Sequence, residues 1–482
     1  MSDTVKKLWT IVHNFFTVSD TSQRKGIVMK GNNKEYLKRL LVIAVPIMLS
    51  NIIGQLQMLI DRIFLGHAND LYMSALSNVT SPVWTTMSFC FSLAAGASIL
   101  ISQSVGANDR ENIEEYAGAL IKYNNIIPVL LFFFWLFLSE PVFRFMGVSD
   151  SLMPMCLSYS RFYAPVFLLT GLASSLSVIL QTSNYTKPMV VYGVLRAGLN
   201  VVLDYVLIYG KWGFPELGIK GAAIGTVIAE YVGGMFIFYI IFTSKRLYTR
   251  PSVQGIKKGK LKNYLISAKL GVNTALEDFA WNLGNLCLIR ILNTINEMAA
   301  GIYSMIFSVE VLAVVIVGAI GSSTMTLTSE ATGKKDLSQY KGVCICAYSL
   351  CLAVAVVLII LDVTIPEQLM SLFTNDTDTI KSCSVYLLIS GINIISKSAN
   401  IIIGNGIRGN GDTKWMLYTQ IFGTISIVCV AAFLVYVCKL GIVGVFLAVL
   451  IDEAVRAVIN LGKYLRIVKA WDTGTSGGKE TN

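Results

Sequence analysis

Residues 343–365 read VCICAYSLCLAVAVVLIILDVTI, a stretch in which Asp362 is the one charged side chain. An α-helix crosses the hydrocarbon core of a bilayer with about 20 mostly apolar residues, so this stretch is long enough to span a membrane. Further stretches of this kind lie at residues 40–61, 76–101, 118–138, 153–180, 189–209, 221–243, 265–292, 299–327, 383–405, 416–437 and 441–462. The sequence therefore predicts an all-α integral membrane protein with twelve transmembrane helices.

The composition agrees with a membrane environment. Of the 482 residues, 54% are hydrophobic and 14% are charged, whereas about a quarter of a typical soluble domain is charged. The net charge of +10 comes from Lys and Arg concentrated before the first predicted span, in the loops after even-numbered spans and near the C-terminus. Because such residues are enriched in cytoplasmic loops, we expect both termini in the cytoplasm and no nucleic-acid partner. The predicted location is the inner or plasma membrane.

The sequence carries no signature of an enzyme. It contains no GxxxxGK[ST] loop of the kind that binds nucleotide phosphates. The nine cysteines lie almost entirely in apolar stretches and form no CxxC pair, so we interpret them as small packing residues. We expect no catalytic activity, no cofactor, and no bound metal other than a coupling ion.

Two halves of the chain resemble each other. Landmarks of the first half recur in order in the second: Ser102-Gln103 and Gly106 as Ser329-Glu330 and Gly333, Thr186-Lys187 as Thr413-Lys414, Met189 as Met416, Leu217-Gly218-Ile219 as Leu440-Gly441-Ile442, and Glu230 as Glu453. A repeat of six spans keeps its orientation in the membrane. The halves are therefore predicted to be two six-helix lobes related by a pseudo-twofold axis along the membrane normal.

This repeat divides the chain. The expected parts are a basic cytoplasmic segment at 1–39, an N-lobe at 40–243, a basic cytoplasmic linker at 244–264, a C-lobe at 265–463 and a cytoplasmic tail at 464–482. Two similar lobes enclose a central cavity that can open alternately to either side, which suits a transporter.

Polar residues in the N-lobe spans are candidates for ion binding. A charge at the bilayer centre costs about 2.5–3.5 kcal/mol, so it needs a partner, water or a function. Asp61 ends the first span, while Asn200 and Asp204, four residues apart, share one face of the fifth helix. Thr226 adds a hydroxyl from the sixth span. Two carboxylates, an amide and a hydroxyl suit a proton or a hard cation such as Na⁺, which Asp61, Asn200 and Asp204 would bind.

These residues also have a structural interpretation. Arg196, one turn before Asn200, and Arg62 can neutralise the acids as plain ion pairs. Pro46 lies fifteen residues before Asp61 and is a candidate hinge, although prolines in membrane helices also serve as simple kinks.

The C-lobe offers a second set of candidates. Glu277 and Asp278 lie in the seventh span and Lys397 in the tenth. Lys397 can pair with one of these acids or with Glu310 of the eighth span, and the pair can be static or switchable.

Several motifs together point to one family. They are Pro46 with Asp61-Arg62-Ile63-Phe64-Leu65-Gly66, Gly96-Ala97 with Ser102-Gln103 and Gly106-Ala107, residues Gln181 to Pro188, Leu217-Gly218-Ile219-Lys220-Gly221-Ala222-Ala223, and Ile407-Arg408-Gly409-Asn410-Gly411-Asp412-Thr413-Lys414. With these motifs the chain resembles the multidrug and toxic compound extrusion (MATE) family from about Leu40 to Tyr464.

The resemblance implies twelve helices in two lobes and export of small organic, often cationic compounds in exchange for H⁺ or Na⁺. The DinF-like branch of the family implies an N-lobe cation site at Asp61, Asn200, Asp204 and Thr226, with Pro46 as the bending point. The NorM-like branch uses acids of the C-lobe instead. Glu277 matches its seventh-helix glutamate, but Lys397 lies near the position of its tenth-helix aspartate, so the chain resembles the DinF-like branch more.

The sequence thus predicts a secondary active multidrug efflux antiporter that works by alternating access, as a monomer in the lipid bilayer. One alternative is a flippase for a lipid-linked saccharide, which would be expected to carry a strongly basic central cavity. The other is a membrane receptor or scaffold, whose ligand would bind without crossing the membrane.

Overall fold

The structure, a computed structural model, describes residues 29–473 except 297, 372 and 375. Residues 1–28 of the predicted basic segment and residues 474–482 of the predicted tail lie outside this part. All regular elements of the described residues are helices. This confirms the all-α fold class.

The first half forms one lobe. Its long helices are α2 (Met29–Ala68), α3 (Asp70–Gly106), α4 (Arg110–Tyr123) continued by α5 (Ile126–Phe137), α7 (Met153–Tyr163) continued by α8 (Val166–Thr182), α9 (Lys187–Tyr209) and α10 (Ile219–Thr243). The short α6 (Ser139–Phe145) lies between α5 and α7. The helices α7 and α8 meet at an angle of 46°. Pro165 stands at this break, where its missing N–H interrupts the helical hydrogen bonds.

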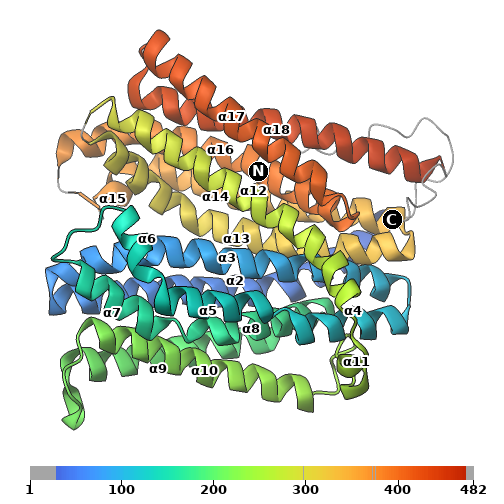
Figure 1. The fold of residues 1–482 in the computed structure, drawn as a ribbon. Coiled ribbons are helices and arrows are strands. Elements are labelled where there is room, and N and C mark those ends of the chain that lie inside the picture. The colour runs from blue at the N-terminus through green and yellow to red at the C-terminus, as the bar shows by residue number, and fades with distance from the viewer. Residues whose placement is uncertain (1–28, 297, 372, 375, 474–482) are drawn as a thin grey trace.

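The second half forms the other lobe. Its long helices are α12 (Leu261–Asn293), α13 (Ala299–Lys334), α14 (Leu337–Thr364), α16 (Thr377–Gly409), α17 (Thr413–Ala432) with a π-helical end at Phe433–Val437, and α18 (Gly441–Asp472). The short α15 (Pro366–Met370) follows α14. The linker contains α11 (Val253–Lys258). Figure 1 shows the N-lobe in blue to green and the C-lobe in yellow to red, packed against each other.

The described residues form twelve helical segments long enough to cross a membrane, with α4–α5 and α7–α8 counted as one segment each. Nine segments of the described chain pass a test of length and hydropathy, and the bent pair α7–α8 is a tenth. The helices α12 and α18, with 33 and 32 residues, are also long enough, but α18 buries the charged residues Asp452, Glu453 and Arg456 and α12 buries Glu277. Several helices continue beyond the predicted spans; α2 begins at Met29 and α18 ends at Asp472.

The two lobes touch at their equivalent glycines. A Cβ on Gly106 would lie 1.9 Å from the carbonyl oxygen of Glu330, and a Cβ on Gly333 would lie 1.8 Å from that of Gln103. Glycine is required here because the α3 and α13 backbones approach too closely for a side chain. Gly106 and Gly333 are also counterparts in the repeat. Equivalent residues that touch each other lie on the axis relating their lobes, so this contact places the pseudo-twofold axis.

Polar contacts join the lobes on the side of the membrane where α11 lies, called here the linker side. Arg39 pairs with Glu330 at 2.5 Å, and Gln103 Nε2 donates to the carbonyl of Gly409 at 2.9 Å. Nearer the middle, the Ser92 hydroxyl donates to Asp278 at 2.8 Å. Beyond that point α12 and α3 diverge, as Figure 1 shows on its left. These contacts hold the lobes together on the linker side, whereas the backbones of α3 and α12 run apart on the other.

Candidate functional site

The four predicted N-lobe residues come together. The Asn200 amide Nδ2 lies 3.2 Å from Asp204 Oδ1 and 3.3 Å from the Thr226 hydroxyl oxygen. Asn200 and Asp204 are fully buried. The carboxyl group of Asp61, from α2, is within hydrogen-bonding distance of the carboxyl group of Asp204. Three helices, α2, α9 and α10, thus supply one oxygen-rich cluster.

This cluster has spare hydrogen-bonding capacity. Among the described residues, none donates a hydrogen bond to the buried oxygens Asp61 Oδ1, Asn200 Oδ1 and Asp204 Oδ2, or to Gln57 Oε1 one turn earlier on α2. Buried acceptors without a donor are costly in a protein interior. A proton between the two carboxyl groups, or a cation among the oxygens, would remove this cost.

The nearby arginine has its own partner. Arg196 pairs with Glu230 at 2.6 Å, and Glu230 also accepts a hydrogen bond from the Tyr192 hydroxyl at 2.7 Å. Arg62 is exposed. The ion pair of Arg196 is therefore with Glu230 of α10, while Asp61 and Asp204 contact each other.

Pro46 lies inside an uninterrupted α2, and a side chain replaces the hydrogen bond that it cannot make. Proline leaves the carbonyl four residues before it, here that of Val42, without a helical donor. The hydroxyl of Thr186 donates to this carbonyl at 2.9 Å. In the C-lobe the equivalent of Thr186 is Thr413, and its hydroxyl accepts from Asn273 Nδ2 at 2.9 Å. In each lobe, the threonine of the recurring Thr-Lys motif thus forms a hydrogen bond with the first helix.

Thr186→Val should lower the thermal stability of the protein, because the Val42 carbonyl loses its donor at a cost of about 1–3 kcal/mol. In the background of Pro46→Ala, which restores a backbone N–H, the same change should cost clearly less. Melting temperatures of the four proteins in detergent, combined as a double-mutant cycle, measure this coupling. An equal loss in both backgrounds would show that Thr186 acts independently of the proline.

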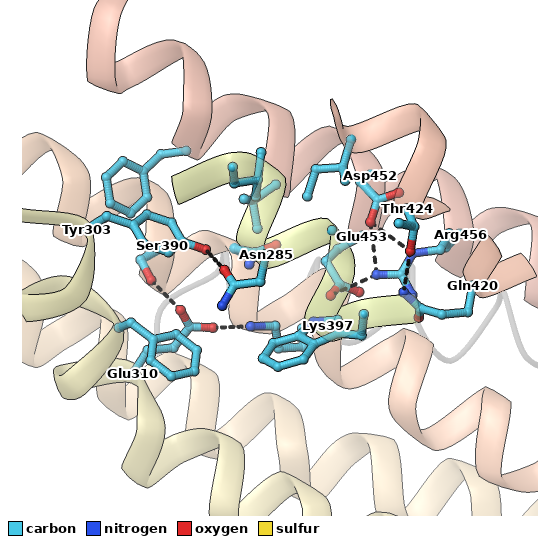
Figure 2. A pocket seen from close by; sticks show the side chains of 18 residues that line it. Asn285, Tyr303, Glu310, Ser390, Lys397, Gln420, Thr424, Asp452, Glu453 and Arg456 are labelled. Atoms are coloured by element: carbon cyan, nitrogen blue, oxygen red, sulfur yellow. Dashed lines mark hydrogen bonds and ion pairs between the residues drawn. The ribbon is translucent and has the colours of Figure 1, made fainter. Parts of the chain in front are cut away.

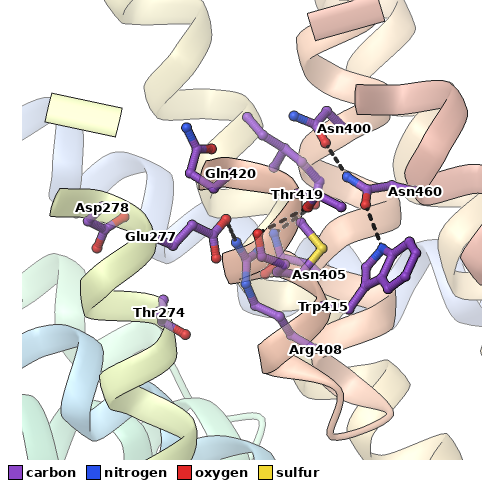
Figure 3. A network of polar contacts seen from close by, with 12 residues as sticks. Thr274, Glu277, Asp278, Asn400, Asn405, Arg408, Trp415, Thr419, Gln420 and Asn460 are labelled. Atoms are coloured by element: carbon purple, nitrogen blue, oxygen red, sulfur yellow. Dashed lines mark hydrogen bonds and ion pairs between the residues drawn. The ribbon is translucent and has the colours of Figure 1, made fainter. Parts of the chain in front are cut away.

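The C-lobe candidates do not form one site. Glu277 pairs with Arg408 of α16, and its neighbour Asp278 instead accepts from Ser92 of the other lobe. Figure 3 shows the two acids leaving α12 in different directions. Lys397 pairs with Glu310, the third of its predicted partners. Each of the three secondary candidates thus makes a polar contact with a different partner.

Lys397 and Glu310 instead line a cavity inside the C-lobe. Glu310 also accepts a hydrogen bond from Ser390 at 2.9 Å. A second charged group lies at the other end of this cavity, where Arg456 bonds Asp452 at 2.9 Å and Glu453 at 3.0 Å. Figure 2 shows the two groups separated, with Asn285 between them. The remaining walls are largely aromatic and aliphatic, and include Trp281, Leu288, Tyr303, Phe307, Ile427, Phe446 and Val449.

A buried chain of hydrogen bonds leads from this cavity toward the linker side. Asn400 donates to Glu453 at 2.9 Å and accepts from Asn460 at 2.6 Å. Asn460 in turn accepts from the indole N–H of Trp415, near the start of α17, at 3.0 Å. Figure 3 shows the part from Trp415 to Asn400. The Glu453 carboxylate is therefore held in place from two sides.

The cavity occupies the place in the C-lobe that the oxygen cluster occupies in the N-lobe. The repeat aligns the four N-lobe residues with apolar ones: Asp61 with Leu288, Asn200 with Ile427, Asp204 with Ala431, and Thr226 with Val449. Three of these apolar counterparts line the cavity. The oxygen ligands of the first lobe thus have no equivalents in the second.

Some site residues were not predicted from the sequence. Gln57 lies four residues before Asp61, a spacing that places both on one face of α2 and could have identified it. Asn393 and Asp452 line the C-lobe cavity, but nothing in their local sequence distinguishes them from structural polar residues.

Comparisons with known proteins agree with this architecture. The family model that matches is MatE, over residues 46–206 and again over 273–434. The two matched segments begin the same interval apart as Gly106 and Gly333. The match is thus itself a repeat, and it covers both lobes.

Individual relatives are distant but extend over most of the chain. A probable multidrug resistance protein NorM of Thermotoga maritima is 26% identical over 444 residues, which cover 91% of this chain and 94% of that one. The uncharacterized transporter YisQ of Bacillus subtilis is 25% identical and covers 82% of this chain and 89% of its own length. A crystal structure of a MATE protein in its bent conformation has a TM-score of 0.83 at 19% identity, covering 93% and 98% of the two chains.

Proposed function

We propose that this chain, which belongs to the MatE family, exports small organic molecules in exchange for inward H⁺ or Na⁺ by alternating access. The observation that carries the proposal is the buried N-lobe cluster of Gln57, Asp61, Asn200 and Asp204. Its four oxygens receive no donor from the described residues. A secondary transporter needs such a site, because a coupling ion must be bound and released in each cycle.

The cluster suits either ion. Two carboxyl groups in contact, as Asp61 and Asp204 are, are stable together when they share a proton or a cation. Na⁺ would be bound by the carboxylate and amide oxygens, with Thr226 as a further oxygen. H⁺ would be held between the two carboxyl groups alone. The aspartate, Asn-x-x-x-Asp and threonine arrangement favours the DinF-like branch.

Ion binding can be transmitted to the contact between the lobes through α2. This helix carries Asp61, and nearer the linker side its residues Ile43 and Ile47 pack in one core cluster with Val317 and Ile320 of α13. The hydrogen bond from Thr186 to the Val42 carbonyl, one turn before Pro46, lies in the same stretch of α2 as Ile43 and Ile47. A change in α2 on ion loading would therefore reach the helices that close the linker side.

The direction of transport follows from the charge distribution. We place the basic linker and both termini on the cytoplasmic side of a plasma or inner membrane. In this orientation the described conformation is closed to the cytoplasm and faces outward. Several relatives are named as probable multidrug resistance proteins, which supports small organic substrates. The proposed substrates include cationic compounds. Both lobes lie in one chain, so a monomer suffices for this mechanism.

The test is transport by purified protein in liposomes loaded with the fluorescent cation ethidium. A pH gradient and a Na⁺ gradient are imposed separately. We expect one of them to drive ethidium movement, and the matching ionophore, which collapses that gradient, to stop it. If neither gradient moves ethidium or other organic cations above protein-free liposomes, the antiporter proposal is wrong. Lipid-linked saccharides are then the next substrates to test.

A further inference from the structure

We propose that a basic pocket at the linker-side end of the N-lobe binds the phosphate head group of an anionic phospholipid. The pocket, called here the linker pocket, lies between the start of α4 and the segment from Lys245 to Ser252 that follows α10. It is separate from the ion cluster and from the C-lobe cavity. The inference goes beyond the proposed function, since it depends neither on export nor on the coupling ion.

The linker pocket has the size of a ligand site. Its volume is about 470 Å³, which is within the roughly 300–1,000 Å³ of typical small-molecule sites. Its walls come from two elements that are distant in sequence. They are Arg110 and Glu114 of α4, and Lys245, Leu247, Tyr248, Arg250 and Ser252 of the linker. A ligand held between them would contact both the N-lobe and the segment that leads to the C-lobe.

The lining residues make the linker pocket positively charged. The three cations Arg110, Lys245 and Arg250 face one acid, Glu114, which leaves a net charge of +2. The ligand is therefore expected to be an anion. Phosphate suits these residues, because a guanidinium group can bind two of its oxygens through parallel N–H donors and an ammonium group adds a compact charge.

The α4 side of the pocket is held in place by the protein itself. Arg110 pairs with Glu114 at 3.2 Å and donates a hydrogen bond to the Tyr248 carbonyl. Its guanidinium carbon lies 5.1 Å from the centre of the Tyr248 ring. The backbone N–H of Ser252 donates to the second oxygen of Glu114 at 2.7 Å. These contacts fix the linker segment over the start of α4 and give the pocket a defined wall.

The other two cations keep donors for a ligand. Arg250 uses Nη1 to donate to the carbonyls of Ile241 and Phe242, in the last turn of α10, at 3.3 and 2.9 Å. Its Nε and Nη2 make no hydrogen bond with any described residue, and neither does the ammonium group of the exposed Lys245. The unused donors of the pocket thus belong to its charged side chains.

The linker pocket lies at the membrane surface, which indicates a lipid as the source of the phosphate. The membrane-spanning α10 ends at Thr243, two residues before Lys245. Tyr239, Phe242 and Tyr248 are exposed there, and such aromatic side chains are enriched where a membrane protein crosses the head-group layer. Basic pockets at this depth bind anionic head groups. Figure 1 shows α10 at the edge of the N-lobe, where acyl chains would lie against it.

A lipid bound here would also act on the contact between the lobes. The Tyr248 hydroxyl donates to Asn108 Oδ1 at 3.3 Å, and Asn108 lies in the turn between Gly106 and α4. A head group that contacts both Arg110 and Arg250 would tie the linker to this turn. The lipid should therefore favour the described conformation, in which the lobes touch at Gly106.

The experiment titrates the purified full-length chain in detergent micelles with phosphatidylglycerol and follows its melting temperature. Zwitterionic phosphatidylcholine is the reference, and we expect phosphatidylglycerol to raise the melting temperature more. Lys245→Glu reduces the net charge of the pocket to zero. It should therefore raise the phosphatidylglycerol concentration for the half-maximal effect at least about tenfold, which corresponds to about 1.4 kcal/mol.

Two further variants complete the design. Lys245→Arg keeps the charge and should behave as wild type. Arg246→Glu is the matched control, because it makes the same charge change at the neighbouring exposed residue, which does not line the pocket and lies 5.7 Å from the centre of the Tyr185 ring. At about 0.15 M salt, where exposed charges are screened beyond about 8 Å, it should shift the half-maximal concentration by less than about threefold.

A second measurement locates the effect and identifies the source of the phosphate. Hydrogen–deuterium exchange of residues 244–252 should decrease with phosphatidylglycerol in wild type but not in Lys245→Glu. Glycerol phosphate, which is the soluble head group, and inorganic phosphate should not reproduce the stabilisation at the same phosphate concentration.

The proposal is overturned if phosphatidylglycerol stabilises the protein no more than phosphatidylcholine does. It is also overturned if Lys245→Glu and Arg246→Glu have equal effects, which would indicate general attraction to a basic surface. Full stabilisation by the soluble phosphates would show that the pocket binds a free anion instead of a lipid. None of these measurements involves an ion gradient or an exported molecule, so their failure leaves the proposed function unaffected.

Discussion

Asp61→Asn should abolish gradient-driven ethidium export, down to the level of protein-free liposomes, while the protein folds normally. Asparagine has nearly the same shape as aspartate but carries no charge and cannot take up a proton. The carboxyl contact between Asp61 and Asp204 would be lost, and with it the group that loads the coupling ion. Export under the driving gradient is the measurement, and thermal stability in detergent shows whether the fold is intact.

The matched control is Asp150→Asn, which changes an exposed aspartate in the loop between α6 and α7. It should transport at the wild-type rate. Gradient-driven export by Asp61→Asn at the wild-type rate would remove the N-lobe cluster from the mechanism. Gln57→Leu then distinguishes the ions: it should raise the Na⁺ concentration needed for half-maximal transport if Na⁺ is coupled, but leave H⁺-driven transport unchanged.

Gly106→Ala and Gly333→Ala should each abolish export by keeping the lobes from closing on the linker side. The added Cβ would lie less than 2 Å from a backbone carbonyl oxygen of the other lobe. Ordinary contacts of this kind need more than about 3 Å, so α3 and α13 must separate by more than about 1 Å. Backbone atoms cannot move aside as a flexible side chain could.

Gly318→Ala is the control for this prediction. It lies on α13 as Gly333 does, but a Cβ there would meet no atom within 4 Å. Export by this variant should match wild type. Hydrogen–deuterium exchange at the linker-side ends of α3 and α13 should increase in the two axial variants only. Equal export by Gly106→Ala and Gly318→Ala would contradict a tight closure at the axis.

Much of the fold could be predicted because one physical signal repeats along the chain. Apolar stretches of sufficient length identify helices in a bilayer even where residues such as Glu310 interrupt them, since a single charge does not change the character of a span. The N-lobe cluster was predictable for a local reason. Asn200 and Asp204 share a helix face by their spacing, Asp61 and Thr226 are polar residues in or at the ends of apolar spans, and the family resemblance joined the four as one cation site.

The C-lobe contacts could not be predicted in the same way. Glu277 and Asp278 are adjacent, so they point about 100° apart around α12 and reach different neighbours. Which helix lies on each side is a property of packing between distant segments, and local sequence does not encode it. For the same reason Lys397 had three candidate partners, and only the fold selects Glu310 among them.

A residue on a twofold axis meets its own counterpart. In a dimer of two identical six-helix chains, the same glycine of each chain would take the places of Gly106 and Gly333, as in any isologous interface. In the fused chain the two glycines are separate positions that can mutate independently. Each nevertheless faces the backbone of the other's helix, so neither can gain a side chain without disturbing both lobes. The linker-side ends of α3 and α13 therefore have the geometry of a homodimer interface within a single polypeptide.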